Sequence, residues 1–343
     1  MRILFIFFVI LFCFNEFKLF GADRKVLLIG IDGLRSDVVL QAYTPNIKYL
    51  ATNGFGTFDS WHQDITISGP SWSSILCGVY HNKHGVLDNS FRGSCYKEYP
   101  MINTLGKRIN PNLKFGMYME WDKLARQCKQ LQWDQIIEGK LGRTGRTQKE
   151  GSQWLKQSDL DFYFIYLGAA DCIGHVSGFS LNNPFYVNAV ERIDKAVGSF
   201  IEAINNRPNY EKEDWLILLT TDHGGYMFSH GGLSVHERKL IWIAYSDRIK
   251  KRNLQSVDCG NLNDVCNPYS AKEVRACPVQ VDIVATSLDH LLYRENQDLF
   301  SCSDCNIEGK SWLTEMGLFS SRSSELYMAL NGSVIPANKR VKF

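Results

Sequence analysis

The sequence has almost no net charge and only one long apolar run, and both features exclude classes of function. Its 343 residues include 38 Lys and Arg and 36 Asp and Glu, which gives a formal net charge of +2. A protein that binds duplex nucleic acid needs a clustered basic face, so this balance argues against such a partner. No short internal repeat is visible, which argues against a repeat architecture. Hydrophobic residues still make up 45% of the chain, ample for a folded core.

The long apolar run lies at the N-terminus. Arg2 precedes ILFIFFVILFCF at residues 3–14, and polar residues follow. A membrane-spanning helix needs about 20 apolar residues, whereas the core of a signal peptide is shorter. We therefore expect residues 1–22 to be a signal peptide, cleaved near Gly21 or Ala22, rather than a membrane anchor. The mature protein is then expected to be secreted, or to stay in the lumen of the secretory pathway, with no integral membrane span.

Cysteine usage is consistent with that compartment. Nine of the ten cysteines remain once Cys13 leaves with the signal peptide, so at least one thiol is free or pairs between chains. Cys77 and Cys172 lie within apolar or motif segments and are the expected free thiols. The CSDC stretch at 302–305 could form a zinc knuckle, but disulfides are the preferred interpretation in an oxidising compartment. NGS at 331–333 is a glycosylation acceptor sequence.

Apolar segments of strand length alternate with segments of helical spacing. Strands are predicted at 25–31, 113–119, 161–168, 215–219 and 240–246. Helices are predicted at 44–54, 185–206 and 279–292. This alternation predicts an α/β fold with a mostly parallel central sheet and helices on both faces.

The domain organisation follows from composition. Residues 87–112 and 250–278 lack clear periodicity, and we interpret them as surface insertions. No break in composition requires a second domain. We expect a single catalytic domain over 23–343, with a Cys-rich insertion around 250–305.

Three acidic residues follow predicted strands. Asp32, Asp171 and Asp222 each lie at or just beyond a carboxyl end, and in parallel sheets these ends meet at one edge, where ligands bind. The histidines close to them in sequence are His175, His223 and His230. One Asp alone is usually a cap or turn residue, but agreement at three strand ends favours a shared centre. Three carboxylates and three imidazoles suit two divalent ions, zinc first, with manganese as the alternative.

Ser68 is the expected nucleophile beside that centre. The segment ITISGPSWSSILCGV places Ser68 two residues before Pro70, at or near the start of a helix. A helix N-terminus favours negative charge, and a metal on the same oxygen would lower the pKa of the hydroxyl further. Without the metal centre, Ser68 would read as an ordinary helix cap.

These motifs resemble the alkaline phosphatase superfamily, and within it the nucleotide pyrophosphatase/phosphodiesterase family. The matching stretches are LLIGIDGLRSDVV, ISGPSWSSILCGVYHNKHG, DCIGHVSG, TTDHGG followed by SHGG, and VQVDIVATSLDHLL. They occur in the family's order and span most of the mature chain. The resemblance implies an alkaline-phosphatase-like three-layer sandwich that hydrolyses small phosphate esters, including nucleotides, with two bound metal ions.

The resemblance also implies roles for single residues. One metal would be held by Asp32, Asp222 and His223, with Ser68 bridging toward it. The other ligands would be Asp171, His175 and His230. We prefer His230 to the nearby His236 because two glycines follow it. Ser68 would attack phosphorus to give a phosphoseryl intermediate that water then hydrolyses.

The sequence departs from the family pattern in two places. Ser68 stands where the phosphodiesterases usually have Thr, and Ser71 stands where they have Asn. We expect the Ser71 hydroxyl to donate one hydrogen bond to a phosphoryl oxygen. A sulfatase is the weaker interpretation, because Trp72 occupies the position of the sulfatase Arg. A phosphomonoesterase, or an inactive secreted binding protein with this fold, are further alternatives.

Diesters are the expected substrates. Residues 65–80 contain no Lys or Arg, whereas a site specialised for the extra charge of a monoester generally adds a cation. Gly69, Ser71 and Trp72 are expected to border uncharged room for the second substituent. Arg35 could pair with Asp37 instead of reaching the substrate. Other cations that could reach in from elsewhere are Lys123, Arg238 and Lys239.

Overall fold

The computed structural model describes residues 23–62, 65–249, 277–292 and 306–318. The predicted signal peptide, the CSDC stretch and the glycosylation sequence lie outside these residues, as does most of the predicted Cys-rich insertion. Within them, Cys77, Cys95, Cys128 and Cys172 form no disulfide. The expectation that Cys77 and Cys172 are free thiols is therefore confirmed.

A seven-stranded sheet forms the centre of the fold, in the order β2-β7-β6-β1-β5-β3-β4. The strands are β1 (Asp23–Ile31), β2 (Phe55–Trp61), β3 (Phe115–Met119), β4 (Gln135–Glu138), β5 (Phe162–Leu167), β6 (Glu213–Thr221) and β7 (Lys239–Tyr245). β1 runs parallel to β5 and β6, and β3 runs parallel to β4 and β5. The mostly parallel sheet predicted from the sequence is thus confirmed.

One strand reverses the pattern. β7 is antiparallel to both β6 and β2. A parallel neighbour requires a crossover to the other end of the sheet, but residues 222–238 return from β6 at the same edge and contain only the short helix α10 (Val235–Arg238). The connection 222–238, which carries several candidate site residues, is therefore also the reason that β7 runs antiparallel to β6.

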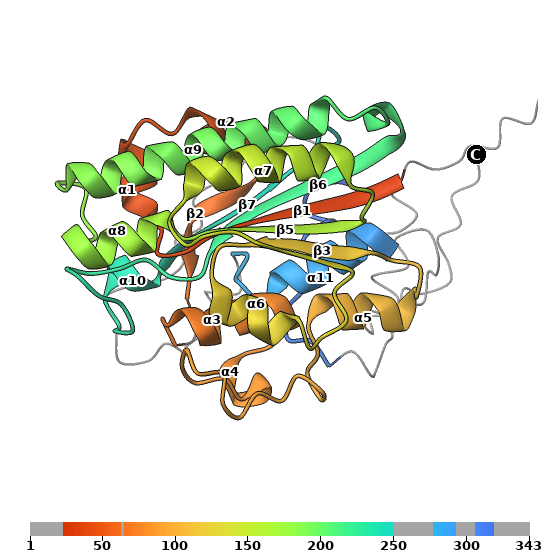
Figure 1. Ribbon diagram of the computed structural model, residues 1–343, viewed down its shortest axis with the longest axis horizontal. Helices are drawn as coiled ribbons and strands as arrows, with labels where there is room; N and C mark the ends of the chain where they lie inside the picture. Colours follow the sequence, from red (N-terminus) through yellow and green to blue (C-terminus); the bar gives the residue numbers. More distant parts are fainter. Residues whose placement is uncertain (1–22, 63–64, 250–276, 293–305, 319–343) are drawn as a thin grey trace, which may run out of the picture.

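Helices cover both faces (Figure 1). On one face lie α1 (Ser36–Gln41), α2 (Pro45–Asn53), α7 (Thr144–Gln157), α8 (Ala169–Ser177) and α9 (Pro184–Asn205). On the other lie α3 (Ser68–Cys77), α4 (His81–His84), α5 (Ile102–Ile109), α6 (Asp122–Cys128) and α11 (Asp282–Leu292). Alternate residues of β1 supply the two cores, with Val26 and Leu28 on the α3 side and Leu27 and Ile29 on the α9 side.

The segment 87–112 is not only a surface insertion. Its helix α5 buries Ile102 and Leu105 in the core on the α3 side. The interpretation as an insertion was wrong here because eight residues are too short to give a clear period. Within the range 250–305, the structure describes helix α11, and every residue of this helix is buried.

Candidate active site

Three adjacent strands bring the acidic residues together. β6, β1 and β5 are neighbours in the sheet, and their carboxyl ends lie at one edge. Asp32 follows β1 directly and Asp222 follows β6 directly, whereas Asp171 lies in the first turn of α8 after β5. The backbone N–H of Asp171 donates to the carbonyl of Asp32, 3.1 Å away, which links two of the strand ends.

Gly33 permits this close approach. Its φ is +66°, and an ideal Cβ at this position would lie 2.7 Å from the Cα of Asp171. Any side chain would therefore push α8 away from β1. The Gly33 N–H also donates to Asp222 Oδ1 (3.1 Å), so this one glycine contacts both other strand ends.

The first group of side chains is buried and consists of Asp32, Asp222 and His223. His223 Nε2 lies 3.2 Å from Asp222 Oδ2 and 3.7 Å from Asp32 Oδ1. Both of those carboxylate oxygens are buried without a hydrogen-bond partner. The other oxygen of each carboxylate is satisfied: Asp222 Oδ1 accepts from the backbone N–H groups of Gly33 and His223, and Asp32 Oδ2 from Tyr166 and Trp72.

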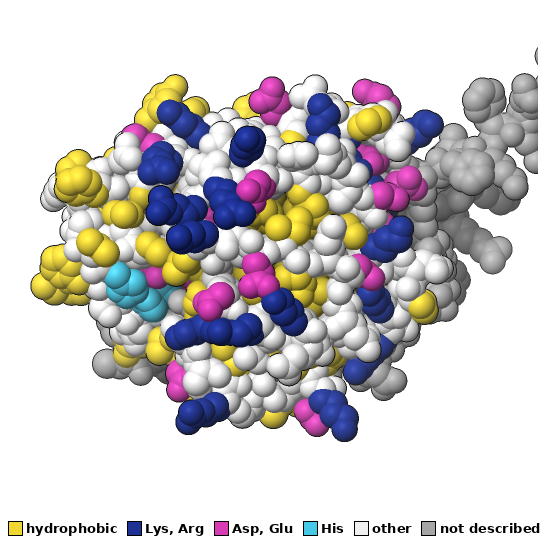
Figure 2. Space-filling model, in the orientation of Figure 1, with side chains coloured by type: hydrophobic (Ala, Val, Ile, Leu, Met, Phe, Trp, Pro, Cys, Tyr) yellow, Lys and Arg dark blue, Asp and Glu magenta, His cyan; other side chains and the backbone are white. Residues whose placement is uncertain are grey.

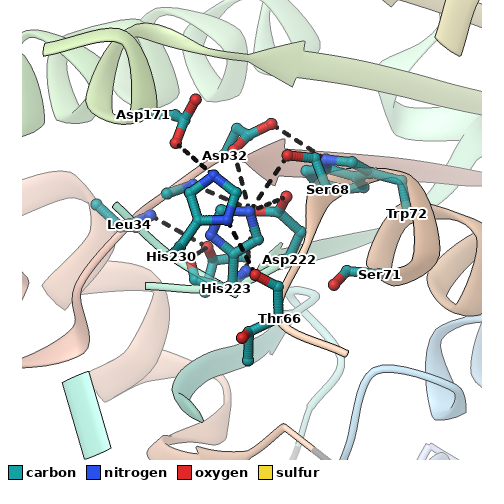
Figure 3. A network of polar contacts seen from close by, with 12 residues as sticks. Asp32, Leu34, Thr66, Ser68, Ser71, Trp72, Asp171, Asp222, His223 and His230 are labelled. Atoms are coloured by element: carbon teal, nitrogen blue, oxygen red, sulfur yellow. Dashed lines mark hydrogen bonds and ion pairs between the residues drawn. The ribbon is translucent and has the colours of Figure 1, made fainter. Parts of the chain in front are cut away.

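The second group is more open and consists of Asp171, His175 and His230. The side chain of His175 is 41% exposed. Asp171 Oδ1, which also lacks a hydrogen-bond partner, lies 3.3 Å from His175 Nε2 and 3.6 Å from His230 Nε2. The two groups adjoin through the rings of His223 and His230, which stack with centroids 3.8 Å apart (Figure 3).

All three imidazoles are oriented in the same way. The Nδ1 atom of His223 lies 2.8 Å from the carbonyl of Gly224, that of His175 2.9 Å from Phe228, and that of His230 2.9 Å from Thr66. These three contacts go to carbonyl oxygens, which only accept, so each Nδ1 carries a proton. Each Nε2 then faces the centre, where it presents a lone pair whenever the ring is neutral. His175 Nε2 and His230 Nε2 lie 3.1 Å apart, so a proton on one of these nitrogens donates to the lone pair of the other.

The electrostatics of the centre favour an added positive charge. Burial and the nearby Asp171 raise the pKa of Asp32 to about 8. Burial and Asp32 also raise the pKa of Asp222 well above its usual range, whereas burial lowers the pKa of His223. Beside Asp171 the pKa of His175 is raised to about 9. Carboxylates that repel one another and carry unpartnered oxygens fit divalent cations well.

Ser68 lies beside the buried group. It opens α3 at the helix N-terminus and is itself buried. Its Oγ lies 3.2 Å from His223 Nε2, so the hydroxyl reaches the same space as the unpartnered carboxylate oxygens (Figure 3). The sequence-based placement of Ser68 near the helix start, and next to His223, agrees with this geometry.

Ser71 and Trp72 do not face that space. The Ser71 Oγ lies 3.0 Å from the Ile65 carbonyl and 2.8 Å from His62 Nε2, so its single proton is directed away from a substrate. Trp72 is fully buried, packs on Tyr166 and donates from Nε1 to Asp32 Oδ2. The expectations that Ser71 donates to a phosphoryl oxygen and that Trp72 borders the substrate are both corrected. One turn of helix beyond Ser68, side chains already point into the core.

Asn89 is a site residue that sequence reasoning missed. Its Oδ1 accepts from the backbone N–H of Gly69 at 2.7 Å, so the carboxamide lies beside the residue that follows Ser68. Because Oδ1 is used in this way, the Nδ2 group remains as a donor near Ser68, the candidate nucleophile. The sequence offered no signal, since an Asp-Asn-Ser stretch in a loop reads as an ordinary turn.

His236 and the nearby cations are engaged elsewhere. His236 Nδ1 lies 2.9 Å from Arg35, and Arg35 also pairs with Asp37, so the expected pairing of Arg35 is confirmed. Among the described residues, His230 belongs to the open group and His236 does not. Arg238 donates to the carbonyl of His62 and lies over the ring of Trp61, and Lys239 pairs with Asp59.

Solved structures share this fold. A 2-O glycosaminoglycan sulfatase matches with a TM-score of 0.55 and 13% identity, covering 67% of this chain and 65% of its own. A protein solved in complex with its substrate D-glucosamine-2-N,6-O-disulfate matches with a TM-score of 0.59 and 12% identity, covering 86% and 80%. At these identities the likeness shows the alkaline-phosphatase-like fold alone. No helix among the described residues is long and apolar enough to cross a membrane.

Sequence comparisons are more specific. Human ectonucleotide pyrophosphatase/phosphodiesterase family member 7 is 26% identical over 227 residues, covering 60% of this chain and 48% of the relative. An uncharacterized pyrophosphatase/phosphodiesterase of Schizosaccharomyces pombe is 23% identical over 265 residues, covering 68% and 52%. The chain thus spans about half the length of these relatives. The family model described as type I phosphodiesterase / nucleotide pyrophosphatase matches residues 26–230, more than half of the chain. The chain therefore belongs to the type I phosphodiesterase / nucleotide pyrophosphatase family.

Proposed function

We propose that this protein is a secreted, metal-dependent hydrolase that cleaves small phosphate diesters through a covalent intermediate on Ser68. One observation carries the proposal. Three unpartnered carboxylate oxygens and three imidazole Nε2 atoms converge beside a serine hydroxyl at a helix N-terminus. Membership of a phosphodiesterase family supports the reaction class.

Two divalent ions would occupy this centre, most readily zinc, with manganese as the alternative. Asp32, Asp222 and His223 would hold one ion, next to the Ser68 hydroxyl. The ligands of the other would be Asp171, His175 and His230. When bound, such ions supply positive charge that lowers the pKa of a neighbouring hydroxyl and offsets charge on the phosphoryl oxygens.

The residues of the chain then have distinct tasks. Ser68, once deprotonated, attacks phosphorus in line, and the bond to the leaving alcohol oxygen breaks as the Oγ–P bond forms. Water attacks the same phosphorus in a second step, breaks the Oγ–P bond and restores the Ser68 hydroxyl. The Nδ2 group of Asn89, whose Oδ1 accepts from the Gly69 N–H, would donate to a phosphoryl oxygen as charge develops there.

The charge around Ser68 supports diesters over monoesters. Residues 65–80 contain no Lys or Arg, and Arg35, Arg238 and Lys239 are engaged with other partners. A monoester would bring one more negative charge without a matching cation from these residues. Comparing kcat/KM for an aryl phosphodiester and a phosphomonoester with the same leaving group measures this preference. A ratio that favours the monoester would contradict the preference for diesters but would not affect the proposed metal centre.

The direct test replaces Ser68 and, as the matched control, Ser71. Ser68→Ala should lower kcat for a soluble aryl phosphodiester by roughly a thousandfold or more, because the covalent intermediate is lost. Its metal content should stay at the wild-type level. Ser71→Ala, one helical turn further, should cost much less activity. Rapid acid quench of the wild-type enzyme, followed by mass spectrometry, should detect the phosphoryl adduct on the peptide containing Ser68. An adduct elsewhere, or full activity of Ser68→Ala, would overturn the mechanism.

A further inference from the structure

The part of the chain around helix α7 is far more basic than the protein as a whole. Residues 140–156 contain five Lys and Arg and one acidic residue, which gives this stretch a net charge of +4 in a chain whose total is +2. Figure 2 shows Lys and Arg side chains gathered over α7 and α9. A concentration of one sign of charge on an otherwise balanced protein indicates a surface for an anionic partner.

Most exposed cations of this face lack an acidic partner among the described residues. Arg146 pairs with Glu150, and the Glu191 carboxylate accepts from the backbone N–H of Tyr43. No ion pair within the described part of the chain involves the remaining cations, which are Arg143, Lys149, Lys156, Arg192 and Lys195. The face holds six cations and three carboxylates, the third being Glu202, and therefore keeps a net positive charge.

A groove lies between α7 and α9 on this face, with a volume of about 700 Å³. Lys149 and Lys156 line it from α7, and Glu202 is the one carboxylate among its lining residues. The side-chain amide of Gln148 donates to the Ser199 hydroxyl at 2.8 Å and links the two helices within the groove. Small lining residues leave the space open, namely Gly145, Ser152 and Ala203.

Two further cations continue the groove along α9. Arg192 and Lys195 precede Ser199 by seven and four residues, so all three lie on one face of the helix. The intervening Asp194 is buried and accepts from the backbone N–H of Ile47 instead. On α7, Lys149 and Lys156 are separated by about 10 Å along the helix axis. The positive charge is therefore spread along a track and does not form a single point.

The lining residues distinguish between kinds of polyanion. Apart from the charged and small residues, the groove is lined by amides and a hydroxyl, those of Gln148, Gln153, Asn206 and Ser199. None of the lining residues is aromatic, whereas proteins that bind single-stranded nucleic acid stack bases on aromatic rings. A flat bilayer cannot enter a groove between two helices. A polysaccharide that carries sulfate or carboxylate groups offers anions to the lysines and hydroxyl groups to the amides.

We propose that the groove between α7 and α9 binds a linear acidic polysaccharide. Lys149 and Lys156 contact its anionic groups, and Arg192 and Lys195 extend the contact along the chain of sugars. Glu202 repels such a ligand and limits its affinity. The groove contains neither the candidate metal ligands nor Ser68, so this proposal is independent of the proposed phosphodiesterase function.

A pair of charge-matched variants tests the location of binding. Lys149→Gln with Lys156→Gln removes two positive charges from the groove. The control, Lys97→Gln with Lys123→Gln, removes two positive charges from exposed lysines elsewhere: Lys123 lies on α6, on the other face of the sheet, and Lys97 lies between α4 and α5. The probe is a fluorescent heparin octasaccharide, whose anisotropy is titrated with the full-length protein.

We expect the groove variant to raise the Kd for the octasaccharide at least about tenfold and the control variant to raise it less than about twofold. Both variants should keep the urea unfolding midpoint of the wild type, because they change exposed side chains. Equal losses in the two variants would show that net charge alone attracts the probe and would overturn the proposal. Wild-type protein that does not bind the octasaccharide would also overturn it.

Glu202→Gln provides a test in the opposite direction. Removing this carboxylate should lower the Kd for the octasaccharide by about two- to fivefold, and wild-type binding should weaken as salt rises from about 0.05 to 0.5 M. Neutral dextran should not bind. Unchanged affinity of the Glu202 variant would contradict binding in the groove. Tighter binding of a single-stranded thymidine oligonucleotide, or of phosphatidylserine vesicles, than of the octasaccharide would overturn the assignment to a polysaccharide.

Discussion

The two halves of the candidate metal centre have similar ligands and opposite surroundings. Asp32, Asp222 and His223 are buried and extend directly from strand ends, whereas His175 and His230 lie on a helix and a loop, with side chains that are 41% and 10% exposed. The buried half is built into the core, so its geometry is set when the sheet forms. The open half is held by hydrogen bonds that can loosen locally while the sheet stays folded.

This difference assigns different tasks to the two halves. The proposed nucleophile Ser68 lies against the buried half, where water is excluded and electrostatic interactions are strong. The open half faces solvent, from which the water of the proposed second step would arrive. Four predictions test whether the distinction is real, in order of decreasing expected effect.

Removing metal should have the largest effect. Exhaustive chelation is expected to abolish turnover of a soluble phosphodiester, by at least about a thousandfold. Loss of metal, followed by elemental analysis over time, should occur in two phases, with one ion leaving quickly and the other slowly. Each phase should account for close to one ion per chain. Full activity after complete removal of metal would exclude a metal mechanism. Loss of both ions in a single phase would show that the two halves do not differ in how they hold metal.

Removing one imidazole from each half should separate stability from metal binding. His223→Ala leaves a cavity in the core and should lower the free energy of unfolding of the metal-free protein by about 2–4 kcal/mol. His175→Ala changes a partly exposed side chain and should cost less than about 1 kcal/mol. Urea titration measures both. Despite this difference in stability, each variant should bind roughly one ion fewer than the wild type. Equal losses in the free energy of unfolding would contradict the difference in burial between the two histidines.

Tyr166→Phe should weaken only the buried half. The Tyr166 hydroxyl donates to Asp32 Oδ2 and thereby turns the other oxygen toward the centre. Loss of such a supporting hydrogen bond typically weakens metal affinity about 10- to 100-fold. Competition with a chromogenic chelator should show weaker binding only of the ion that dissociates slowly. Weakening of both phases would mean that the halves are coupled.

Glu120→Gln should give the smallest effect, and on the open half. The buried Glu120 accepts from the N–H groups of Gly168 and Gly142, and Gly168 caps the helix that carries Asp171 and His175. A neutral amide can accept the same hydrogen bonds less strongly. The affinity for the ion that dissociates quickly should therefore fall by roughly two- to tenfold. The same chelator competition measures it, and Tyr166→Phe serves as the opposite control. A change in the slow phase would show that Glu120 supports the buried half instead.

Much of this arrangement could be predicted from the sequence, because strand ends carry positional information. Asp32, Asp171 and Asp222 follow predicted strands, and parallel neighbours necessarily share one carboxyl edge. The strand at 240–246 was predicted, but its antiparallel direction was not, since direction depends on where the connection returns. β2 and β4 were missed because Phe55–Trp61 alternates weakly and Gln135–Glu138 has only four residues.

The details of the site were less predictable than its location. Asn89 lies 21 positions after Ser68 in a loop, and only folding brings its carboxamide to Gly69. Ser71 and Trp72 were expected beside the substrate because they are close to Ser68 in sequence. The helix turns their side chains into the core, where one contacts Ile65 and the other Asp32. Sequence proximity to a nucleophile therefore does not establish proximity to the substrate.

The backbone carbonyls that orient the imidazoles have a consequence for how this protein can diverge. Gly224, Phe228 and Thr66 hold His223, His175 and His230 through main-chain atoms, which every substitution retains. Genetic drift at position 228 can therefore change the side chain presented at the mouth without altering the imidazole beside it. A lineage, or a directed-evolution library randomised at 227 and 228, can vary the side chains at the mouth while the orientation of the three imidazoles is retained.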